Sequence, residues 1–407
     1  MGGLSFGDFE PSCAAPPKPG AHDELRRRAQ RAGVPLNAVM QVTARCNFRC
    51  AHCYETHTDG AGELTLAEID RILGELADLG VLYLGYTGGE FFMRPDADDL
   101  LRAARSHGFL VRLLTTGYHV NDKRADLLQD LGIFEVHISL YGHTPEIHEQ
   151  VTLLPGSWER SVAAVDRLRS RGIHVVLKSP LMRVNADHVD EMIAFAAARG
   201  CEMRIDPKVT AREDGDHAPL LMRASDEQVS RYYAKYRVPA ALRSGNRFEP
   251  SDPAASSSCG VARASLLINP TGLVFPCTSI PVACGDLRVQ NVSDVWFRSS
   301  FLATMRGVTW DSIEPCRSCD VRRYCMRCHA QAMLEDGALL GKSSEACRHA
   351  VLLRDQLRAA GIVPESDRAL PPASDASKVR TLDVVSVYGP SAPATAKRAN
   401  GLKVLAA

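Results

Sequence analysis

The chain has 407 residues, and 48 lysine and arginine residues are balanced by 48 aspartate and glutamate residues. This balance gives no reason to expect a nucleic acid or an anionic membrane surface as a partner. No apolar run reaches the roughly 18 residues of a transmembrane helix, and residues 1–20 lack the pattern of a secretory signal. We therefore expect a cytoplasmic protein of two or three domains that buries a core without disulfide bonds.

The cysteines fall into two groups. The chain has 13 cysteines, and all but Cys13 and Cys201 lie within residues 46–53 or 259–347. In a reducing compartment these residues would not form disulfides. Thiolates that gather in groups converge on a metal ion or a cluster. The grouping therefore predicts two metal-binding regions.

Residues 35–215 alternate short apolar runs with amphipathic segments. Strands are predicted at 38–43, 81–86, 110–115, 135–139, 174–179 and 202–206, where apolar and β-branched residues dominate, as in buried parallel strands. Helices are predicted at 65–79, 122–131, 158–171 and 186–199. The first opens with Thr65 and Glu68 in capping-box spacing. Helix-ending glycines are expected at 80, 108, 132, 172 and 200.

Six successive strand–helix units predict an α/β fold with a parallel sheet and right-handed crossovers. Closed barrels of this kind have eight units, so six suggest a partial (β/α)6 TIM-like barrel that is open on one side. A doubly wound flat sheet is the alternative, and the pattern alone does not separate the two. Residues 1–34 are an N-terminal extension, and residues 216–258 are a helical linker. Residues 354–407 are expected to be a helix end and a flexible tail.

The first cysteine group, Cys46, Cys50 and Cys53, lies in a short loop directly after the first predicted strand. Three thiolates leave one iron of a four-iron cluster open, and an open iron can bind a ligand. The alternative is a zinc ion with His52 or His57 as fourth ligand.

The run from Cys46 to Tyr54, with His52 at the aromatic position, resembles the signature of the radical S-adenosylmethionine (SAM) superfamily. The resemblance implies a 4Fe-4S cluster whose open iron chelates SAM. Cleavage of SAM then yields a 5′-deoxyadenosyl radical that abstracts hydrogen. Cys46, Cys50 and Cys53 would be the catalytic cluster ligands, and Tyr54 would lie beside the cofactor.

The same resemblance implies further SAM contacts at the carboxyl ends of the strands. Gly88, Gly89 and Glu90 match the motif that binds the methionyl amino group, although two glycines alone would fit a simple turn. Ser139 matches the position that contacts the ribose, or it is a cap. Lys178 would meet the SAM carboxylate, or it is a solvated lysine. Family members often have asparagine where Thr116 stands, so Thr116 is not among the expected SAM contacts.

The second group resembles the seven-cysteine SPASM domain and is placed at 259–353, with zinc ribbons as the alternative. Its fourfold run ends in Cys-x2-Cys instead of Cys-x3-Cys. The resemblance implies two auxiliary iron–sulfur clusters. One cluster, distal to the active site, would be held by Cys316, Cys319, Cys325 and Cys347, and the nearer one would be held by Cys259, Cys277 and Cys328. Cys284 could supply a fourth ligand to the nearer cluster, or an open iron there could bind substrate.

The combined resemblance implies a peptide or protein substrate and an oxidoreductase that matures ribosomal peptides by a thioether or carbon–carbon crosslink or by epimerisation. Formylglycine formation, as in sulfatase maturation, is the runner-up, and Thr278 stands where that branch has an aspartate after Cys277. A small-molecule substrate and a non-catalytic redox scaffold are further alternatives. A flavodoxin or ferredoxin reductant is implied. Residues 1–34 are too few for a leader-binding domain, so a leader peptide would be presented by a separate leader-binding protein or bound directly by the barrel.

Overall fold

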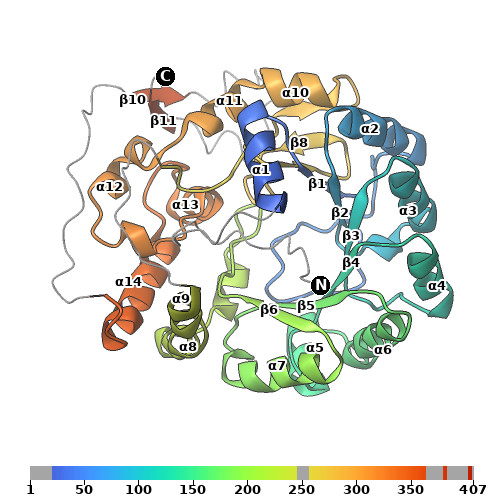
Figure 1. The fold of residues 1–407 in the computed structure, drawn as a ribbon, viewed down its shortest axis with the longest axis horizontal. Helices are drawn as coiled ribbons and strands as arrows, with labels where there is room; N and C mark the ends of the chain where they lie inside the picture. Colours follow the sequence, from blue (N-terminus) through green and yellow to red (C-terminus); the bar gives the residue numbers. More distant parts are fainter. Residues whose placement is uncertain (1–20, 245–255, 364–378, 383–401, 406–407) are drawn as a thin grey trace.

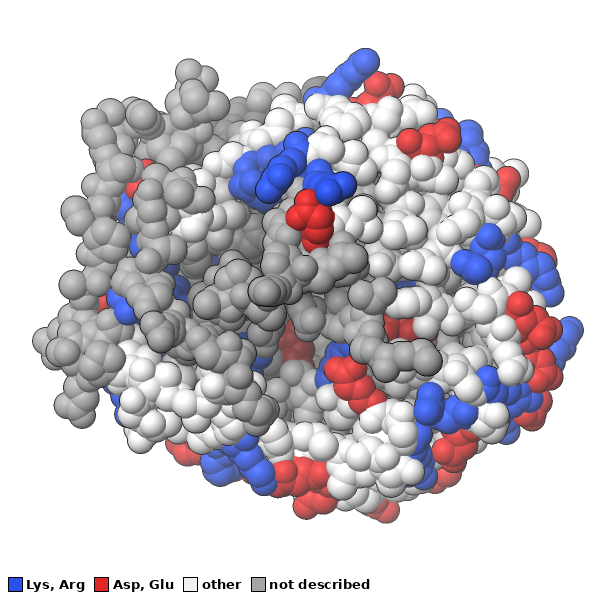
Figure 2. All heavy atoms as spheres, viewed as in Figure 1, with Lys and Arg blue, Asp and Glu red and all other residues white. Residues whose placement is uncertain are grey.

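The computed structural model describes residues 21–244, 256–363, 379–382 and 402–405 (Figure 1). Most of the predicted tail and residues 245–255 of the predicted linker lie outside this part. Helix α1 (Ala21–Ala32) precedes the barrel and contains the basic segment of the N-terminal extension. In the described part of the chain, no helix is both long and apolar enough to cross a membrane. Figure 2 shows acidic and basic side chains interspersed over the barrel helices on the face in view.

Six parallel strands form the barrel sheet, and each lies within two residues of its predicted bounds. They are β1 (Asn37–Gln41), β2 (Tyr83–Thr87), β3 (Leu110–Thr115), β4 (Glu135–Ser139), β5 (Val175–Pro180) and β6 (Glu202–Asp206). The helices between them are α2 (Leu66–Asp78), α3 (Ala97–Ser106), α4 (Asp122–Asp130), α5 (Pro145–Thr152), α6 (Ser157–Ser170) and α7 (Val189–Ala198).

The strand order is β6-β5-β4-β3-β2-β1, followed by β7-β8-β9. Each crossover therefore moves one strand further in the same direction, and Figure 1 shows α2, α3, α4, α6 and α7 on the outer side of the curved sheet. A doubly wound sheet would reverse its strand order near the middle. The partial barrel is therefore confirmed, and the flat alternative is wrong.

Local signals explain most helix ends. Thr65 and Glu68 form the expected capping box at the start of α2. The five predicted helix-ending glycines all have positive φ angles, which glycine adopts without a steric penalty. Helix α5 was not predicted. It is eight residues long, begins with Pro145 and ends at Leu153 in the left-handed region, with a φ of 56°.

The cysteine-rich part begins by extending the barrel sheet. Strand β7 (Ser265–Ile268) pairs in parallel with β1, and β8 (Leu273–Phe275) and β9 (Gly285–Asp286) follow as antiparallel strands. Gly272, with a φ of 92°, makes the predicted hairpin turn. The remaining elements are α8 (Asp226–Tyr232), α9 (Val238–Ser244), α10 (Val292–Arg298), α11 (Ser300–Gly307), α12 (Glu314–Arg317), α13 (His329–Asp336), α14 (Ser344–Ala359), β10 (Val379–Leu382) and β11 (Leu402–Leu405).

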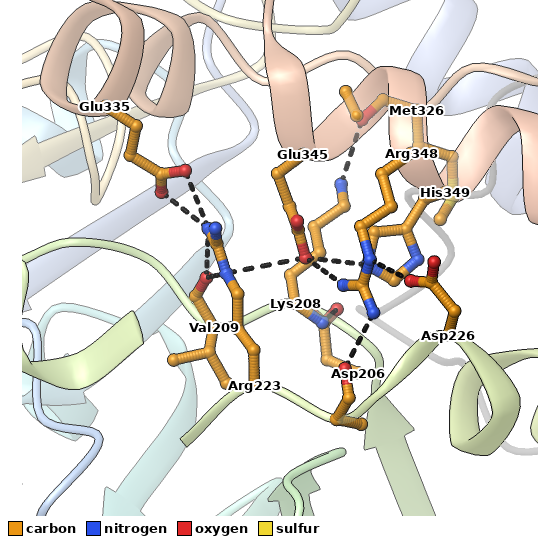
Figure 3. Close-up of polar contacts among 12 residues, drawn as sticks. Asp206, Lys208, Val209, Arg223, Asp226, Met326, Glu335, Glu345, Arg348 and His349 are labelled. Carbon is orange, nitrogen blue, oxygen red and sulfur yellow. Dashed lines mark hydrogen bonds and ion pairs between the residues drawn. The ribbon is translucent and has the colours of Figure 1, made fainter. Parts of the chain in front are cut away.

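A polar joint fastens the cysteine-rich part to the barrel (Figure 3). Arg223, from the segment before α8, donates to both carboxylate oxygens of Glu335 on α13, at 2.8 and 2.7 Å. It also donates to the carbonyl of Val209, just beyond β6. Arg348 on α14 donates to Asp226 at 2.6 Å and to Glu345 at 3.0 Å. These contacts fix the second cysteine group relative to the carboxyl ends of the barrel strands.

Candidate functional site

The loop after β1 holds Cys46, Cys50 and Cys53 against the end of α5. The backbone N–H of Ala51 donates to the Val151 carbonyl at 2.9 Å, and that of Cys53 donates to the Cys50 carbonyl at 3.0 Å. The three thiols are close enough that their charges influence one another. The unpredicted helix α5 is thus the support for the first cysteine group.

The surroundings of these thiols oppose ionisation without a metal. Burial raises the pKa of Cys46 to about 12 and that of Cys53 to about 11, and it raises the pKa of Cys50 further. Metal-bound cysteines are thiolates, and a bound cation supplies the charge that keeps them so. A cationic centre bound by the three thiols would therefore favour their thiolate forms against the effect of burial.

The loop fits an iron–sulfur cluster. The Phe48 backbone N–H donates to the Cys46 sulfur at 3.4 Å, as donors to cluster sulfurs do. Both amide atoms of Asn47 are buried without a hydrogen-bond partner among the described residues, which is the mark of a loop shaped around a group.

The zinc alternative needs ligands around one ion. No three or more His, Cys, Asp or Glu side chains within the described residues are so arranged. A cluster instead places each thiolate on a separate iron. His52 packs its ring edge-on against Tyr141, with centroids 4.7 Å apart, and burial lowers its pKa to about 4. His52 therefore acts as a neutral ring that packs beside the loop.

Gly88 and Gly89 bring the end of β2 onto the cysteine loop. A Cβ at Gly88 would lie 2.5 Å from the Thr43 carbonyl oxygen, and one at Gly89 would lie 2.5 Å from the Arg45 carbonyl oxygen. The backbone N–H of Gly89 donates to Thr43, and that of Glu90 donates to Arg45, at 2.9 and 2.8 Å. The sequence led us to expect a close approach to a ligand, but the described contact of these glycines is with the loop itself.

Glu90 is fully buried in a cage of donors. Its carboxylate accepts from the Thr115 hydroxyl at 2.6 Å, from the Thr116 hydroxyl and backbone N–H at 2.7 Å each, and from the Phe92 N–H at 3.1 Å. These bonds stabilise a charged carboxylate beside Cys46, whose pKa the Glu90 charge raises. Thr116 was left outside the predicted site, and the structure places it in direct contact with Glu90.

Ser139 ends the fourth strand, and Tyr141 follows it toward the cysteine loop. The Tyr141 hydroxyl lies within hydrogen-bonding reach of Ser139 and of the Cys50 thiol. Burial, together with the Cys50 charge, raises the Tyr141 pKa well above its usual value. Tyr141 therefore stays a neutral donor at the cluster loop. The only signal for Tyr141 in the sequence is its position two residues past a strand end.

Lys178 lies beside Ser139, since the two residues are register partners in β4 and β5. Its side chain reaches solvent, yet the surrounding protein atoms lower its pKa. The charge of Asp206 opposes this shift, whereas the charges of Arg112 and Arg204 add to it. Lys178 therefore sits in an open but protein-walled interior, as a residue facing the barrel cavity would.

A cavity of about 210 Å³ separates the two cysteine groups. Tyr54 and Glu55 line it from the first loop, and Cys277 and Thr278 line it from the turn after β8. Glu213 lines it as well. Burial and the charge of Glu213 raise the pKa of Glu55 to about 8. A molecule in this cavity would contact both the loop of the first cysteine group, at Tyr54, and the second cysteine group, at Cys277.

The second cysteine group divides into two sets whose thiols influence one another's ionisation. These two sets are the ones that the resemblance implied. Cys284 lies close to Cys277, and the Cys284 thiol is 3.5 Å from the Val282 carbonyl oxygen. One set is Cys316, Cys319, Cys325 and Cys347, and the other is Cys259, Cys277 and Cys328.

Comparisons with known proteins agree with this geometry. A PqqA peptide cyclase of Ruegeria pomeroyi is 30% identical over 322 residues, which cover 75% of this chain and 85% of the relative. An AdoMet-dependent heme synthase of Methanosarcina barkeri is 24% identical over 330 residues, covering 75% and 94%. Streptococcus suis SuiB bound to its precursor peptide SuiA shares the fold, with a TM-score of 0.61 at 14% identity over 80% of each chain.

Family models match both parts of the chain. The model of the radical SAM superfamily matches residues 40–196, and that of the iron–sulfur cluster-binding SPASM domain matches residues 259–320. The first match covers the first cysteine group and the barrel from Met40 in β1 to Ala196 in α7, and the second match covers the start of the second group. The chain therefore belongs to the radical SAM superfamily, as a radical SAM enzyme with iron–sulfur clusters and a SPASM domain.

Proposed function

We propose that this enzyme matures a ribosomally made peptide by forming a thioether or carbon–carbon crosslink. The observation that carries the proposal is the cavity between Tyr54 and Cys277, because a side chain held there would contact both Tyr54, the residue after Cys53, and Cys277 of the second cysteine group. The PqqA peptide cyclase relative and the peptide-bound SuiB structure support a peptide in this role.

The barrel residues prepare the site for SAM. The 4Fe-4S cluster held by Cys46, Cys50 and Cys53, when bound, supplies the electron that cleaves SAM. Glu90, fixed by Thr115 and Thr116, presents a buried carboxylate that suits the methionyl ammonium. We propose that Ser139 contacts the ribose and that Lys178 contacts the SAM carboxylate.

The second cysteine group suits an oxidative outcome. A crosslink removes two hydrogens from the peptide, which is a two-electron oxidation. Hydrogen abstraction accounts for one electron, and the second needs an acceptor near the substrate. Cys277 lines the same cavity as Tyr54, so we propose that the nearer auxiliary cluster, held by Cys259, Cys277 and Cys328, is this acceptor. The distal cluster would be held by Cys316, Cys319, Cys325 and Cys347, and Cys284 is the candidate for a fourth thiolate on the nearer one.

The partners follow from the same chemistry. We propose a flavodoxin or ferredoxin as reductant and a separate protein that presents a leader peptide. A cytoplasmic location is proposed too, because ligand cysteines stay reduced there.

The test is anaerobic reaction of the reconstituted chain with SAM, a reductant and candidate precursor peptides, followed by mass spectrometry. We expect 5′-deoxyadenosine and a peptide that is lighter by two hydrogens, and neither product from the Cys46→Ala variant. Unchanged peptide mass with deuterium uptake from solvent would indicate epimerisation instead of a crosslink. Turnover of a small molecule alone, with all peptides unchanged, would contradict the proposal and favour the type of reaction named for the heme synthase relative.

A further inference from the structure

Arg327 lies in the stretch that joins the two auxiliary cysteine sets. Cys325, which belongs to the distal set, lies two residues before Arg327, and Cys328, which belongs to the nearer set, follows it directly. The Arg327 side chain is only 3% exposed. A guanidinium is always charged in proteins, so this position carries a buried positive charge between the two sets.

The nitrogen and oxygen atoms that accept hydrogen bonds from Arg327 are neutral. Nη1 donates to His329 Nδ1 at 2.6 Å, and Nη2 donates to the carbonyls of Leu339 and Gly341 at 2.9 and 2.6 Å. The Nε–H group forms no hydrogen bond to an oxygen or nitrogen atom of the described residues. A buried cation without a matching anion is costly, so these contacts hold the guanidinium in place without offsetting its charge.

His329 extends this arrangement toward the nearer set. A guanidinium N–H can only donate, so His329 Nδ1 must accept from Arg327. The ring proton is then on Nε2, which donates to the Ser258 hydroxyl at 2.9 Å. Ser258 immediately precedes Cys259. The orientation of Arg327 is thus fixed by groups adjacent to ligands of the nearer set.

Arg327 also contacts the cysteines. Its side chain forms a hydrogen bond with that of Cys316 in the distal set, and the next residue in the sequence is Cys328 of the nearer set. A cluster held by thiolates is anionic, and nearby charge and hydrogen bonds to sulfur set its reduction potential.

We propose that Arg327 is a positioning residue that acts as the shared counter-charge of the two auxiliary clusters and raises their reduction potentials. The inference rests on the ligand assignment in the proposed function. A higher potential would favour transfer of the substrate electron to these clusters, and a charge shared by both would keep their potentials close.

The experiment uses the full chain with Cys46, Cys50 and Cys53 replaced by alanine, so that only the auxiliary clusters give signals. Iron and sulfide content is measured first, and the midpoint potentials are then found by redox titration monitored by electron paramagnetic resonance. The variants are Arg327→Met, which removes the charge, and Arg327→Lys, which keeps it. Arg323→Met is the matched control, because the Arg323 guanidinium lies over the Tyr324 ring, 6.0 Å from its centroid.

We expect Arg327→Met to lower at least one auxiliary midpoint potential, while Arg327→Lys and Arg323→Met stay close to the parent. Loss of the clusters in Arg327→Met alone would also support the counter-charge. Unchanged potentials in a loaded Arg327→Met chain would overturn the inference, as would equal shifts in Arg323→Met or cluster loss in both Arg327 variants. A parent chain without auxiliary iron would overturn the ligand assignment as well, so the two failures are distinguishable.

Discussion

The Glu90 carboxylate accepts two hydrogen bonds from Thr116, one from its backbone N–H and one from its hydroxyl, both at 2.7 Å. The two residues follow adjacent strands, β2 and β3, and neither is exposed by more than 7%. Thr116 therefore fixes the position of the carboxylate that we propose for the SAM ammonium group.

Replacing Thr116 by valine should weaken SAM binding. The change keeps the side-chain shape but removes a hydrogen bond to a charged acceptor, which contributes about 1.5–3 kcal/mol, so we expect a loss of affinity of roughly tenfold or more. Equilibrium SAM binding to the anaerobically reconstituted chain measures it. Ser106→Ala, which removes an exposed hydroxyl on α3, is the control, and parent-like SAM affinity in Thr116→Val would refute the role.

Replacing Gly89 by alanine should impair loading of the first cluster. The new Cβ would lie 2.5 Å from the Arg45 carbonyl oxygen and 2.9 Å from the Cβ of Cys46, so the cysteine loop would have to move. We expect the variant to lose about one cluster's worth of iron per chain, measured by iron analysis after reconstitution.

The matched control for this change is Gly74→Ala. Gly74 lies in α2, and a Cβ there would meet only the His107 side chain, at 3.6 Å. Alanine favours a helix by about 1 kcal/mol relative to glycine, so this variant should load iron normally and unfold no earlier than the parent. Equal iron content in the Gly89 and Gly74 variants would contradict the packing argument.

Acid should destabilise the barrel through His137. Burial lowers its pKa to about 4, although hydrogen bonding to Glu135 opposes the shift. Between pH 6.5 and pH 4 the unfolded chain binds a proton that folded His137 does not, so the fold loses stability as pH falls, by at most about 1.4 kcal/mol per pH unit.

The variant His137→Gln should therefore show a shallower fall in the free energy of unfolding between pH 7 and pH 5. Urea unfolding of the metal-free chain at several pH values measures this slope. The control is His174→Gln, because His174 is largely exposed, with 48% of its side chain accessible. A slope that stays at the parent value in His137→Gln would show that His137 is not the source.

Breaking the joint between Arg223 and Glu335 should cost more than breaking an exposed ion pair. Glu335 is 8% exposed and Arg223 is 19% exposed, and Glu335→Gln would leave Arg223 with the longer ion pair to Glu345, at 3.4 Å. We expect a loss of about 2–3 kcal/mol in the free energy of unfolding. Lys235→Met removes the exposed pair with Asp190 and should cost no more than about 1 kcal/mol. Similar urea midpoints for the two variants would refute the difference.

The sequence determined the parallel strands, most of the helices and the grouping of the cysteines. Strand and helix periodicity is local, so the runs at 110–115 and 135–139 gave the bounds of β3 and β4 directly. The capping box at Thr65 and the left-handed glycines are equally local, because the conformation of one or two residues decides them.

Contacts between distant strands were decided only by the tertiary structure. The strand order excluded the flat sheet, since hydrophobic periodicity is the same in a barrel and in a doubly wound fold. Three contacts depend on which loops meet in space. They are the hydrogen bonds from Thr116 to Glu90, the contact of Tyr141 with Cys50, and the position of Arg327 between the two auxiliary cysteine sets. The sequence named the cysteines because their spacing is unusual, whereas the neutral and cationic groups that position them are common residues that only the fold brings into contact.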